Sequence, residues 1–209
     1  LNAVKEAKEK GGSRNFTQSV ELILNLKDID MKSPQGRIQE DIEIPHPPKE
    51  KPKKICVIAT GELALKAKKA NADLVMDRAE VEALAGNKKE LKKIANEYSF
   101  FLVETPLMPL VGKIFGAILG PRGKRPIPVP PSAEIEARIN KYRRTITVRM
   151  RNQPVIQCRV GTENMSEQEI TENIKAVINA VEGKLQKGAK NIRSVYVKTT
   201  MGKPVKIKV

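Results

Sequence analysis

The sequence predicts two domains of mixed α and β structure, with one domain inserted into the other. Strands with alternating apolar and polar residues occur within the first 47 residues and return after residue 144, whereas continuous apolar strands alternate with helices between them. Alternating strands are covered on one face, and continuous apolar strands on both. We therefore expect a discontinuous α+β domain with an antiparallel sheet built from both termini (1–47 and 145–209), and an inserted Rossmann-like α/β domain (48–144).

The composition is that of a globular protein with real hydrophobic cores. The chain has 209 residues, of which 40% are hydrophobic and 30% charged, enough for two ordinary domains. No window approaches 18 apolar residues, and Leu1 begins a charged stretch without a hydrophobic segment behind it. We expect neither a membrane span nor a signal peptide, and a cytoplasmic location.

The net charge of +15 is the strongest compositional signal. A polyanionic partner explains such an excess, and nucleic acid is the first candidate. Residues 1–47 hold 7 basic and 8 acidic residues, 48–144 hold 20 and 11, and 145–209 hold 12 and 5. With seven aromatic residues and no tryptophan, the chain lacks a platform for stacking bases, so a structured RNA recognised by its shape and backbone fits better.

The residues that build metal or catalytic sites are scarce. Cys56 and Cys158 have no CxxC spacing, and His46 is the only histidine. A zinc site or a Cys/His catalytic pair therefore has almost nothing to build on, and no metal or cofactor is expected. We interpret both cysteines as buried reduced thiols.

The N-terminal region predicts a short helix and two strands. Residues 1–10 form a charged helix ended by Gly11-Gly12, and the strand that starts near Phe16 places Val20, Leu22, Leu24 and Leu26 on one face. Residues 37–44 repeat the alternation after a turn at 33–36, and we expect these two strands to pair. Residues 45–54, PHPPKEKPKK, have no apolar anchor and predict a semi-rigid linker; the alternative is a basic surface loop.

The inserted region alternates strands with helices, as a parallel sheet requires. Strands are predicted at 55–59, 72–76 and 100–103, and helices at 63–70 and 79–98, the latter interrupted near Gly86-Asn87. A glycine-containing helix follows and is expected to end at Gly120-Pro121. Ser132 is expected to cap the next helix, which runs to Tyr142.

The basic loop after that glycine-containing helix is a candidate for phosphate contact. Its candidate residues are Gly120, Arg122, Gly123, Lys124 and Arg125. The loop is not a P-loop, because Arg125 stands where Ser or Thr is needed and a helix precedes it. No GxGxxG follows the apolar strands either.

The C-terminal region predicts two hairpins around an amphipathic helix. Residues 145–150 and 155–160 are expected to pair across a turn at 152–154, and Ser166 with Glu169 forms a capping box that starts the helix. A closing hairpin spans 195–209, and its turn, 199–204, combines hydroxyls with a glycine. The turn is either an ordinary hairpin loop or a surface that lies close to a flat polar partner.

Three blocks carry a resemblance to a known family: NFTQSVEL at 15–22, GKIFGAILGPRGKRPIPVP at 112–130 and SVYVKTTMGKPVKI at 194–207. In these blocks, their order and the whole length, the chain resembles the L-one family of large-subunit ribosomal proteins of the lateral stalk, in its archaeal type. The resemblance implies a non-enzymatic protein that binds the rRNA of the stalk near the tRNA exit site. It also implies involvement in release of deacylated tRNA, repression of translation through its own mRNA, and a monomer off the ribosome.

The resemblance also implies an RNA-binding surface. It comprises Phe16, Thr17, Gln18, Ser19, Glu21, Thr200, Met201 and Gly202, with Arg37, Arg159, Gly161, Thr162, Ser194 and Lys198 as neighbours. Periodicity independently places Thr17, Ser19 and Glu21 on a polar strand face, and hydroxyls suit the 2′-hydroxyls of an RNA minor groove. Phe16 has the parity of the core residues, so its role is core packing or contact with a ribose. Arg122, Lys124 and Arg125 would then touch RNA weakly, or meet tRNA.

Two alternatives compete with this interpretation. An enzyme with a nucleotide site in the α/β region lacks the phosphate motif, and would be stabilised by ATP or NAD. A non-specific basic RNA chaperone would bind any duplex equally, with a steep dependence on salt.

Overall fold

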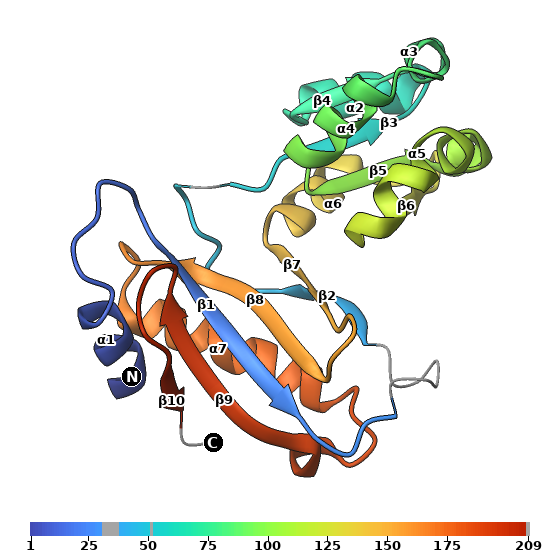
Figure 1. Ribbon diagram of the computed structural model, residues 1–209. Coiled ribbons are helices and arrows are strands. Elements are labelled where there is room, and N and C mark those ends of the chain that lie inside the picture. Colours follow the sequence, from blue (N-terminus) through green and yellow to red (C-terminus); the bar gives the residue numbers. More distant parts are fainter. Residues whose placement is uncertain (31–37, 51, 208–209) are drawn as a thin grey trace. The chain divides into compact units, whose positions relative to one another are not determined.

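The computed structural model describes residues 1–30, 38–50 and 52–207. These residues divide into two units: unit 1, Leu1–Lys51 with Arg144–Val209, and unit 2, Pro52–Arg143. Unit 1 has a sheet made of strands from both ends of the chain, and unit 2 has a parallel sheet (Figure 1). The predicted fold class is confirmed. Arg37 and the turn predicted at 33–36 lie outside the described residues.

Unit 1 is an antiparallel sheet covered by helices on one face. The strand order is β10-β9-β1-β8, so the N-terminal strand β1 lies between two strands from the C-terminal region. The predicted closing hairpin is confirmed as β9 paired with β10. The elements of this unit are α1 (Asn2–Glu9), β1 (Ser19–Leu26), β2 (Gln39–Glu43), β7 (Thr145–Arg149), β8 (Val155–Thr162), α7 (Glu167–Glu182), η3 (Gly188–Asn191), β9 (Ile192–Thr199) and β10 (Val205–Ile207).

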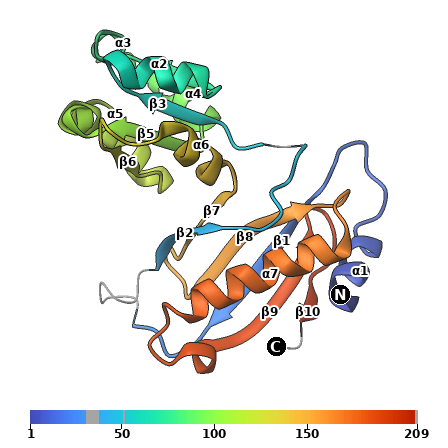
Figure 2. The same ribbon diagram turned by 180° about the vertical axis from the view of Figure 1, so that it is seen from behind.

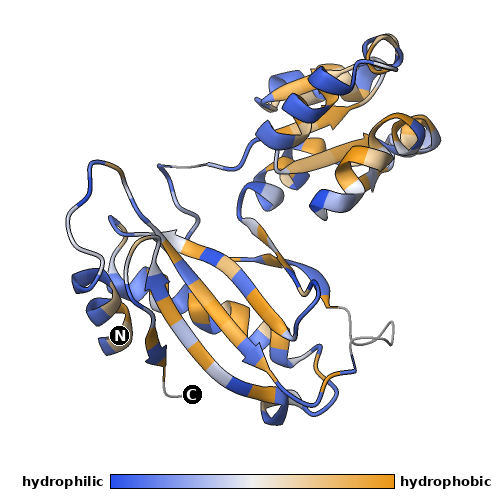
Figure 3. Cartoon of the chain, viewed as in Figure 1, coloured by the Kyte–Doolittle hydropathy of each residue, from blue (hydrophilic) through white to orange (hydrophobic). Residues whose placement is uncertain are grey.

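Strict alternation along β1 builds the core of unit 1. The side chains of Val20, Leu22, Leu24 and Leu26 are buried, and they face the apolar stripe of α7. The alternation appears as bands along β1, β8 and β9 in Figure 3, and Figure 2 shows α7 lying across the sheet. Each buried aliphatic side chain contributes about 1.5–3 kcal/mol. The predicted capping box starts α7, because the Glu169 N–H donates to Ser166 Oγ at 3.2 Å.

Two predicted strand pairings in unit 1 are wrong. Strand β2 does not pair with β1, and β7 does not form a hairpin with β8; instead β2 and β7 pair with each other in a separate two-stranded sheet. Alternation specifies which face of a strand is buried, and only a tight turn also specifies the partner. The eight-residue strand β1 takes the central position because β8 and β9 match its full length.

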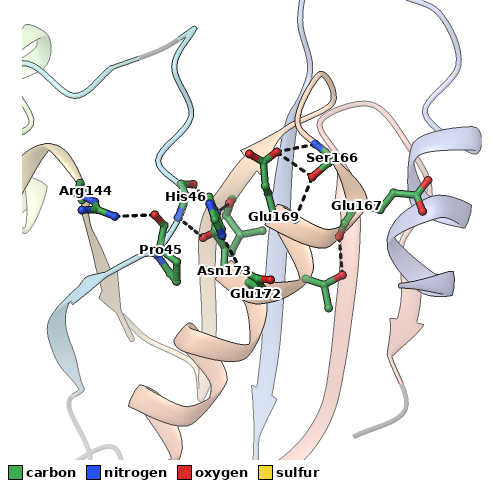
Figure 4. Close-up of polar contacts among 10 residues, drawn as sticks. Pro45, His46, Arg144, Ser166, Glu167, Glu169, Glu172 and Asn173 are labelled. Atoms are coloured by element: carbon green, nitrogen blue, oxygen red, sulfur yellow. Dashed lines mark hydrogen bonds and ion pairs between the residues drawn. The ribbon is translucent and has the colours of Figure 1, made fainter.

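The beginning of the predicted linker is fixed to unit 1. The His46 N–H donates to Asn173 Oδ1 at 2.9 Å, and Asn173 Nδ2 donates to the carbonyl oxygens of His46 and Val160 (Figure 4). Arg144 also donates to the Pro45 carbonyl at 2.9 Å, and Pro48 is buried. The expectation that nothing anchors this segment is therefore wrong for residues 45–48. The buried side-chain amide of Asn173 holds the backbone of this segment. A pattern of apolar residues does not reveal such an anchor.

Unit 2 is a parallel sheet of order β4-β3-β5-β6 with helices on both faces. One face of β3 and β5 packs against α3, α4 and α5, and the other against α2 and α6. The continuous apolar strands of the sequence are thus explained. The elements are β3 (Ile55–Ile58), α2 (Gly61–Lys69), β4 (Leu74–Met76), α3 (Arg78–Ala83), α4 (Lys88–Glu97), β5 (Phe100–Glu104), η2 (Thr105–Leu107), α5 (Met108–Arg122), β6 (Pro126–Val129) and α6 (Ile135–Arg143).

Three details of unit 2 differ from the sequence-based expectation. Helix α5 runs through Gly120 and Pro121 and ends at Gly123, which has the left-handed φ of +72°; a proline in the last turn removes only one helical hydrogen bond. The edge strand β6 was not predicted, and its prolines are tolerated because it is at the edge. Ser132 lies in a turn closed by the Ala133 N–H and the Pro130 carbonyl, so it does not cap α6.

The two cysteines are free and buried, as predicted. Burial raises the pKa of the Cys56 thiol to about 12, so this group stays protonated and unreactive near neutral pH. Among the helices of the described residues, none has both the length and the apolar character that a membrane span requires.

Candidate nucleic-acid interface

The two ends of the chain meet at one end of the unit 1 sheet. The Ser19 N–H donates to Thr200 Oγ1 at 3.0 Å, and the Thr200 N–H donates to the Ser19 carbonyl at 3.0 Å. These bonds continue the β1–β9 ladder by one residue into the closing turn. We name this region the junction (Phe16–Glu21 and Thr199–Gly202). Because they are bonded to each other, Ser19 and Thr200 can belong to one surface.

Gln18 is the buried centre of the junction. Its side-chain Oε1 accepts from the Met201 N–H at 3.1 Å, while Nε2 donates to the Gly12 carbonyl at 3.0 Å. Its backbone N–H donates to Glu163 Oε1 at 2.8 Å, and the Gln18 side chain is fully buried. Gln18 therefore links the N-terminal segment to Glu163 and Met201, which lie far from it in the sequence. It fixes the conformation of the surface from below, and its amide faces protein atoms.

Glycines let the closing turn pack directly onto the turn after α1. A Cβ added at Gly202 would lie 2.3 Å from Thr199 Oγ1 and 3.1 Å from Gly11 Cα, and one added at Gly11 would lie 2.6 Å from the same hydroxyl. Real Cβ atoms do not approach other atoms so closely. Both glycines are buried. Close packing inside the protein thus explains why the closing turn has a glycine at position 202. The sequence alone does not reveal this packing.

The fourteen candidate residues occupy three kinds of position. Four are buried and form the frame, two are exposed, and seven are half-buried with part of the side chain in solvent. The frame comprises Gln18, Gly161, Thr162 and Gly202; the exposed residues are Phe16 and Met201; the half-buried ones are Thr17, Ser19, Glu21, Arg159, Ser194, Lys198 and Thr200. Arg37 is outside the described residues.

Phe16 and Met201 are the exposed apolar side chains of the junction, with 51% and 60% of their surfaces accessible. The core role allowed by the parity of Phe16 is wrong, because β1 begins only at Ser19 and the alternation does not extend to Phe16. In the sequence, Phe16 is three residues before Ser19, and Met201 follows Thr200. Exposed apolar groups near hydroxyls suit a partner that has both apolar and polar surfaces, such as a nucleotide.

Glu21 has a cation on each neighbouring strand. It is opposite Arg159 on β8 and opposite Lys198 on β9, in the register of the sheet. The Lys198 ammonium donates to the Thr200 carbonyl at 3.2 Å, and burial lowers the pKa of the Arg159 guanidinium. This row gives a reason for a carboxylate in a candidate interface for an anionic partner, because a cation stands opposite it on each neighbouring strand.

The basic loop of unit 2 uses two of its cations internally. Lys124 Nζ donates to the carbonyls of Ala95 and Tyr98 at 2.6 Å each, and Arg122 donates to Asn96 and to the Ile118 carbonyl. Burial, and then the charge of Arg122, lower the pKa of Lys124. The two bonds of Lys124 satisfy carbonyls at the C-terminal end of α4 that lack helical partners. Gly120, Arg122 and Gly123 belong to the end of α5 and its cap, with Arg125 exposed after them.

Substituting Lys124 by glutamine is expected to lower the free energy of unfolding of unit 2 by about 1–2 kcal/mol, because two charge-assisted hydrogen bonds are lost. Lys113, an exposed lysine on the same helix α5, gives the matched control, and Lys113→Gln should change stability by less than about 0.5 kcal/mol. Urea denaturation of both variants measures the difference. Equal stabilities would show that Lys124 is not a helix cap.

The site that would hold a nucleotide in unit 2 is occupied by a side chain of the protein itself. At the carboxyl ends of the adjacent strands β3 and β5, the Thr60 N–H and Oγ1–H donate to Glu104 Oε2 at 2.8 and 2.9 Å. Open α/β sheets bind phosphates at this place, at the N-terminus of the following helix. A carboxylate there excludes an anion. Within the described ranges, no group of three His, Cys, Asp or Glu residues is arranged to hold a metal ion.

Comparison with known proteins defines the class. The family model described as the ribosomal protein L1p/L10e family matches residues 4–203. A protein named large ribosomal subunit protein uL1 from Methanothermobacter thermautotrophicus is 49% identical over 207 residues, covering 99% of this chain and 97% of its own. Proteins of the same name from Hyperthermus butylicus and Pyrococcus abyssi are 52% and 47% identical, over 99% and 100% of this chain and 94% of theirs.

These matches place the chain among ribosomal proteins and outside the enzymes. The chain belongs to the ribosomal protein L1p/L10e family, in the form found in archaea. The predicted resemblance is therefore confirmed over essentially the whole length.

Proposed function

We propose that this protein is a structural constituent of the large ribosomal subunit in the cytoplasm, and that it binds the rRNA of the lateral stalk, near the tRNA exit site, through the junction of unit 1. The family membership and the name of the relatives support the ribosomal role. The net charge of +15 supports a polyanionic partner. The observation that carries the proposal is the direct bonding of Ser19 to Thr200, which joins two candidate segments into one surface.

Recognition in this proposal depends on small uncharged groups held in fixed positions. The half-buried Thr17, Ser19 and Thr200 present hydroxyls and backbone groups, which match the 2′-hydroxyls and base edges of an RNA minor groove. Phe16 and Met201 add apolar contact with riboses or bases. The buried bonds of Gln18 hold these groups in place before the RNA arrives, so little ordering cost remains at binding.

The cations have a separate role in the proposal. Lysines and arginines of both units attract RNA over long range, and the junction fixes the register. Since Arg122 and Lys124 are bound to helix carbonyls, the secondary basic loop is a weak contact at most, for rRNA or for tRNA at the exit site. The Glu21 carboxylate, balanced by its two neighbouring cations, accepts from a 2′-hydroxyl or a base amino group.

The proposal includes two further roles, one in regulating translation and one in the release of tRNA. A matching element in the protein's own mRNA would occupy the junction and repress translation, in competition with rRNA. On the ribosome, the protein would take part in the release of deacylated tRNA. We expect a monomer away from the ribosome. Competition between an mRNA leader fragment and a stalk-rRNA fragment for one site on the protein tests the first of these roles.

A gel-shift titration tests the proposed function. At about 0.15 M salt, the wild type should prefer a stalk-rRNA fragment to an unrelated RNA of equal length. Met201→Ala and Phe16→Ala should weaken binding of the stalk fragment roughly tenfold, since each loses an exposed apolar contact worth about 1–2 kcal/mol. Thr200→Val should also lose discrimination, because the valine cannot bond to Ser19.

The matched control for Met201→Ala is Leu65→Ala, because Leu65 is an equally exposed apolar residue of unit 2. It should leave both affinities unchanged. Equal affinity of the wild type for the two RNAs would instead favour the non-specific chaperone. Loss of binding on neutralising Arg122, Lys124 and Arg125, with Thr200→Val intact, would mean that unit 2 holds the site.

A further inference from the structure

A rigid turn closes the other end of the unit 1 sheet. The buried Asn191 accepts from the Lys187 N–H at 2.8 Å and donates from Nδ2 to the Lys27 carbonyl at 2.9 Å, while the Lys27 N–H donates to the Asn191 carbonyl at 2.8 Å. The first bond closes the turn itself, and the other two link the chain after β1 to the segment before β9 (Figure 1). The turn is therefore as well fixed as the junction at the opposite end.

This turn concentrates positive charge on the surface. Lys27, Lys187, Lys190 and Arg193 are exposed, and we name them the cation turn. The ion pairs found among the described residues do not involve these four side chains, whereas the nearby Lys184 pairs with Glu40 at 3.3 Å. The acidic groups near the turn are Asp28, Asp30 and Glu182. Four cations are therefore accompanied by three carboxylates.

A β-bulge turns Arg193 outward. In the ladder between β1 and β9, Asn25 is opposite Ser194 but Leu26 is opposite Ile192, so Arg193 is an extra residue without a partner position. Without the shift, Arg193 would have the parity of the buried Val195 and Val197 and would point into the core. Bulges often re-aim a side chain at a binding surface. Here the bulge exposes a guanidinium next to the lysines.

The cation turn and the junction are the two ends of one surface. Ile192 and Thr199 are seven steps apart along β9, a distance of about 23 Å at the rise of a strand. The face between them has no covering helix in Figure 1, because α1 and α7 pack on the other face. Cross-strand rows along this face are polar at both ends: Glu21 with Lys198 near the junction, and Asn25, whose Nδ2 donates to Ser194 Oγ at 3.0 Å, near the cation turn.

We propose that the cation turn is a second contact for the backbone phosphates of the RNA whose minor groove occupies the junction. The inference rests on the proposed function and deepens it: uncharged groups read the RNA at one end of the sheet, and cations bind phosphates of the same RNA about 23 Å away. An RNA is the occupant that fits, because four clustered cations complement a phosphodiester backbone and the surface continues directly from the junction. The contact is independent of sequence and lengthens the RNA footprint.

Neutralising the turn tests the proposal. In K27Q/K187Q/K190Q, affinity for the stalk-rRNA fragment at about 0.15 M salt should fall roughly tenfold, and the slope of log affinity against log salt should lose about 2 in magnitude, because each lost phosphate contact removes about 0.7–0.9. The control K5Q/K49Q/K175Q makes the same charge change at exposed lysines off this face. It should change affinity less than threefold. Equal effects of the two triple variants would overturn the proposal, because only long-range attraction would remain.

Tethered cleavage locates the RNA directly. An iron–EDTA group on Lys190→Cys should cut the bound stalk fragment, and the same group on Lys175→Cys, on the exposed side of α7, should not; Cys56 and Cys158 are buried and do not compete for the label. Absence of cuts from position 190, while Met201→Ala still weakens binding, would overturn the second contact and leave the proposed function standing. Failure of the wild type to prefer the stalk fragment would overturn both.

Discussion

Replacing Gly202 by alanine is expected to lower the free energy of unfolding of unit 1 by about 2–3 kcal/mol. The new Cβ would lie 2.3 Å from Thr199 Oγ1 and 3.1 Å from Gly11 Cα. Thr199 is fully buried, and its branched side chain has few alternative rotamers. The backbone of Gly11 is held by its own N–H, which donates to the Lys8 carbonyl at 3.0 Å. The clash can therefore be relieved only if the closing turn moves away from the turn after α1. This movement would also displace Thr200 and Met201 at the surface.

Gly183→Ala is the matched control in the same unit. A Cβ there would meet its nearest atoms at 3.5 and 3.8 Å, which are ordinary contacts, and Gly183 has right-handed helical φ and ψ. This substitution should be neutral or stabilise by up to about 1 kcal/mol, through the smaller entropy of the unfolded chain. Denaturant unfolding followed by circular dichroism compares the two. A Gly202→Ala variant as stable as the wild type would show that the turns do not require close packing.

The Asn173→Ala variant should lose about 3 kcal/mol of stability. Asn173 is completely buried and makes three hydrogen bonds, accepting from the His46 N–H and donating to the carbonyls of His46 and Val160. Alanine leaves these backbone groups without partners away from water, each at a cost of about 1 kcal/mol or more. The segment around His46 should also loosen, so its amide should exchange with solvent hydrogen much faster than in the wild type.

Glu172→Gln separates the role of Asn173 from that of the neighbouring ion pair. Glu172 lies next to Asn173, is exposed, and contacts His46 Nε2 at 2.5 Å (Figure 4). An exposed pair contributes little, so this variant should lose less than about 1 kcal/mol and keep slow exchange at His46. If both variants loosened the segment equally, the ion pair and not the buried amide would anchor it.

Periodicity predicts the elements of this fold well, and their partners less well. The alternation in β1 and the apolar runs of β3 and β5 identify which faces are buried, because burial follows side-chain parity. The exchange of partners, β2 with β7 instead of β1 with β2, depends on packing across the whole unit. Strand β6 was missed because prolines at 126 and 128 are atypical of strands, and only its edge position makes them acceptable.

The frame of the candidate interface was the harder part to predict. Gln18 stands between half-buried residues and Gly202 between exposed ones, and nothing local in the sequence shows that both are buried. Gly11 resembles an ordinary helix stop, and Thr199 a turn hydroxyl. One signal was available: Asn173 falls between Ile170 and Val177 on the apolar stripe of α7. A polar residue there predicts a buried amide that bonds to another segment.

The greatest excess of positive charge and the candidate interface lie in different units for a physical reason. The excess of positive charge is greatest in residues 48–144, yet Lys124 and Arg122 of that region satisfy helix carbonyls. Attraction depends on the summed charge, whereas recognition depends on groups with fixed geometry. Unit 1 provides the fixed geometry, because its two chain ends are bonded to each other and to Gln18.

The methionine methyl signals of the full chain, recorded by NMR with and without the stalk-rRNA fragment, test the central claim most directly. The chain has six methionines. Met201 is 60% exposed at the junction, whereas Met150 is buried in the core of unit 1 and Met76 in the core of unit 2. The fragment should shift and broaden the Met201 signal strongly and leave Met76 and Met150 in place. An unchanged Met201 signal together with a large shift at Met108, in α5 of unit 2, would contradict RNA recognition by the junction.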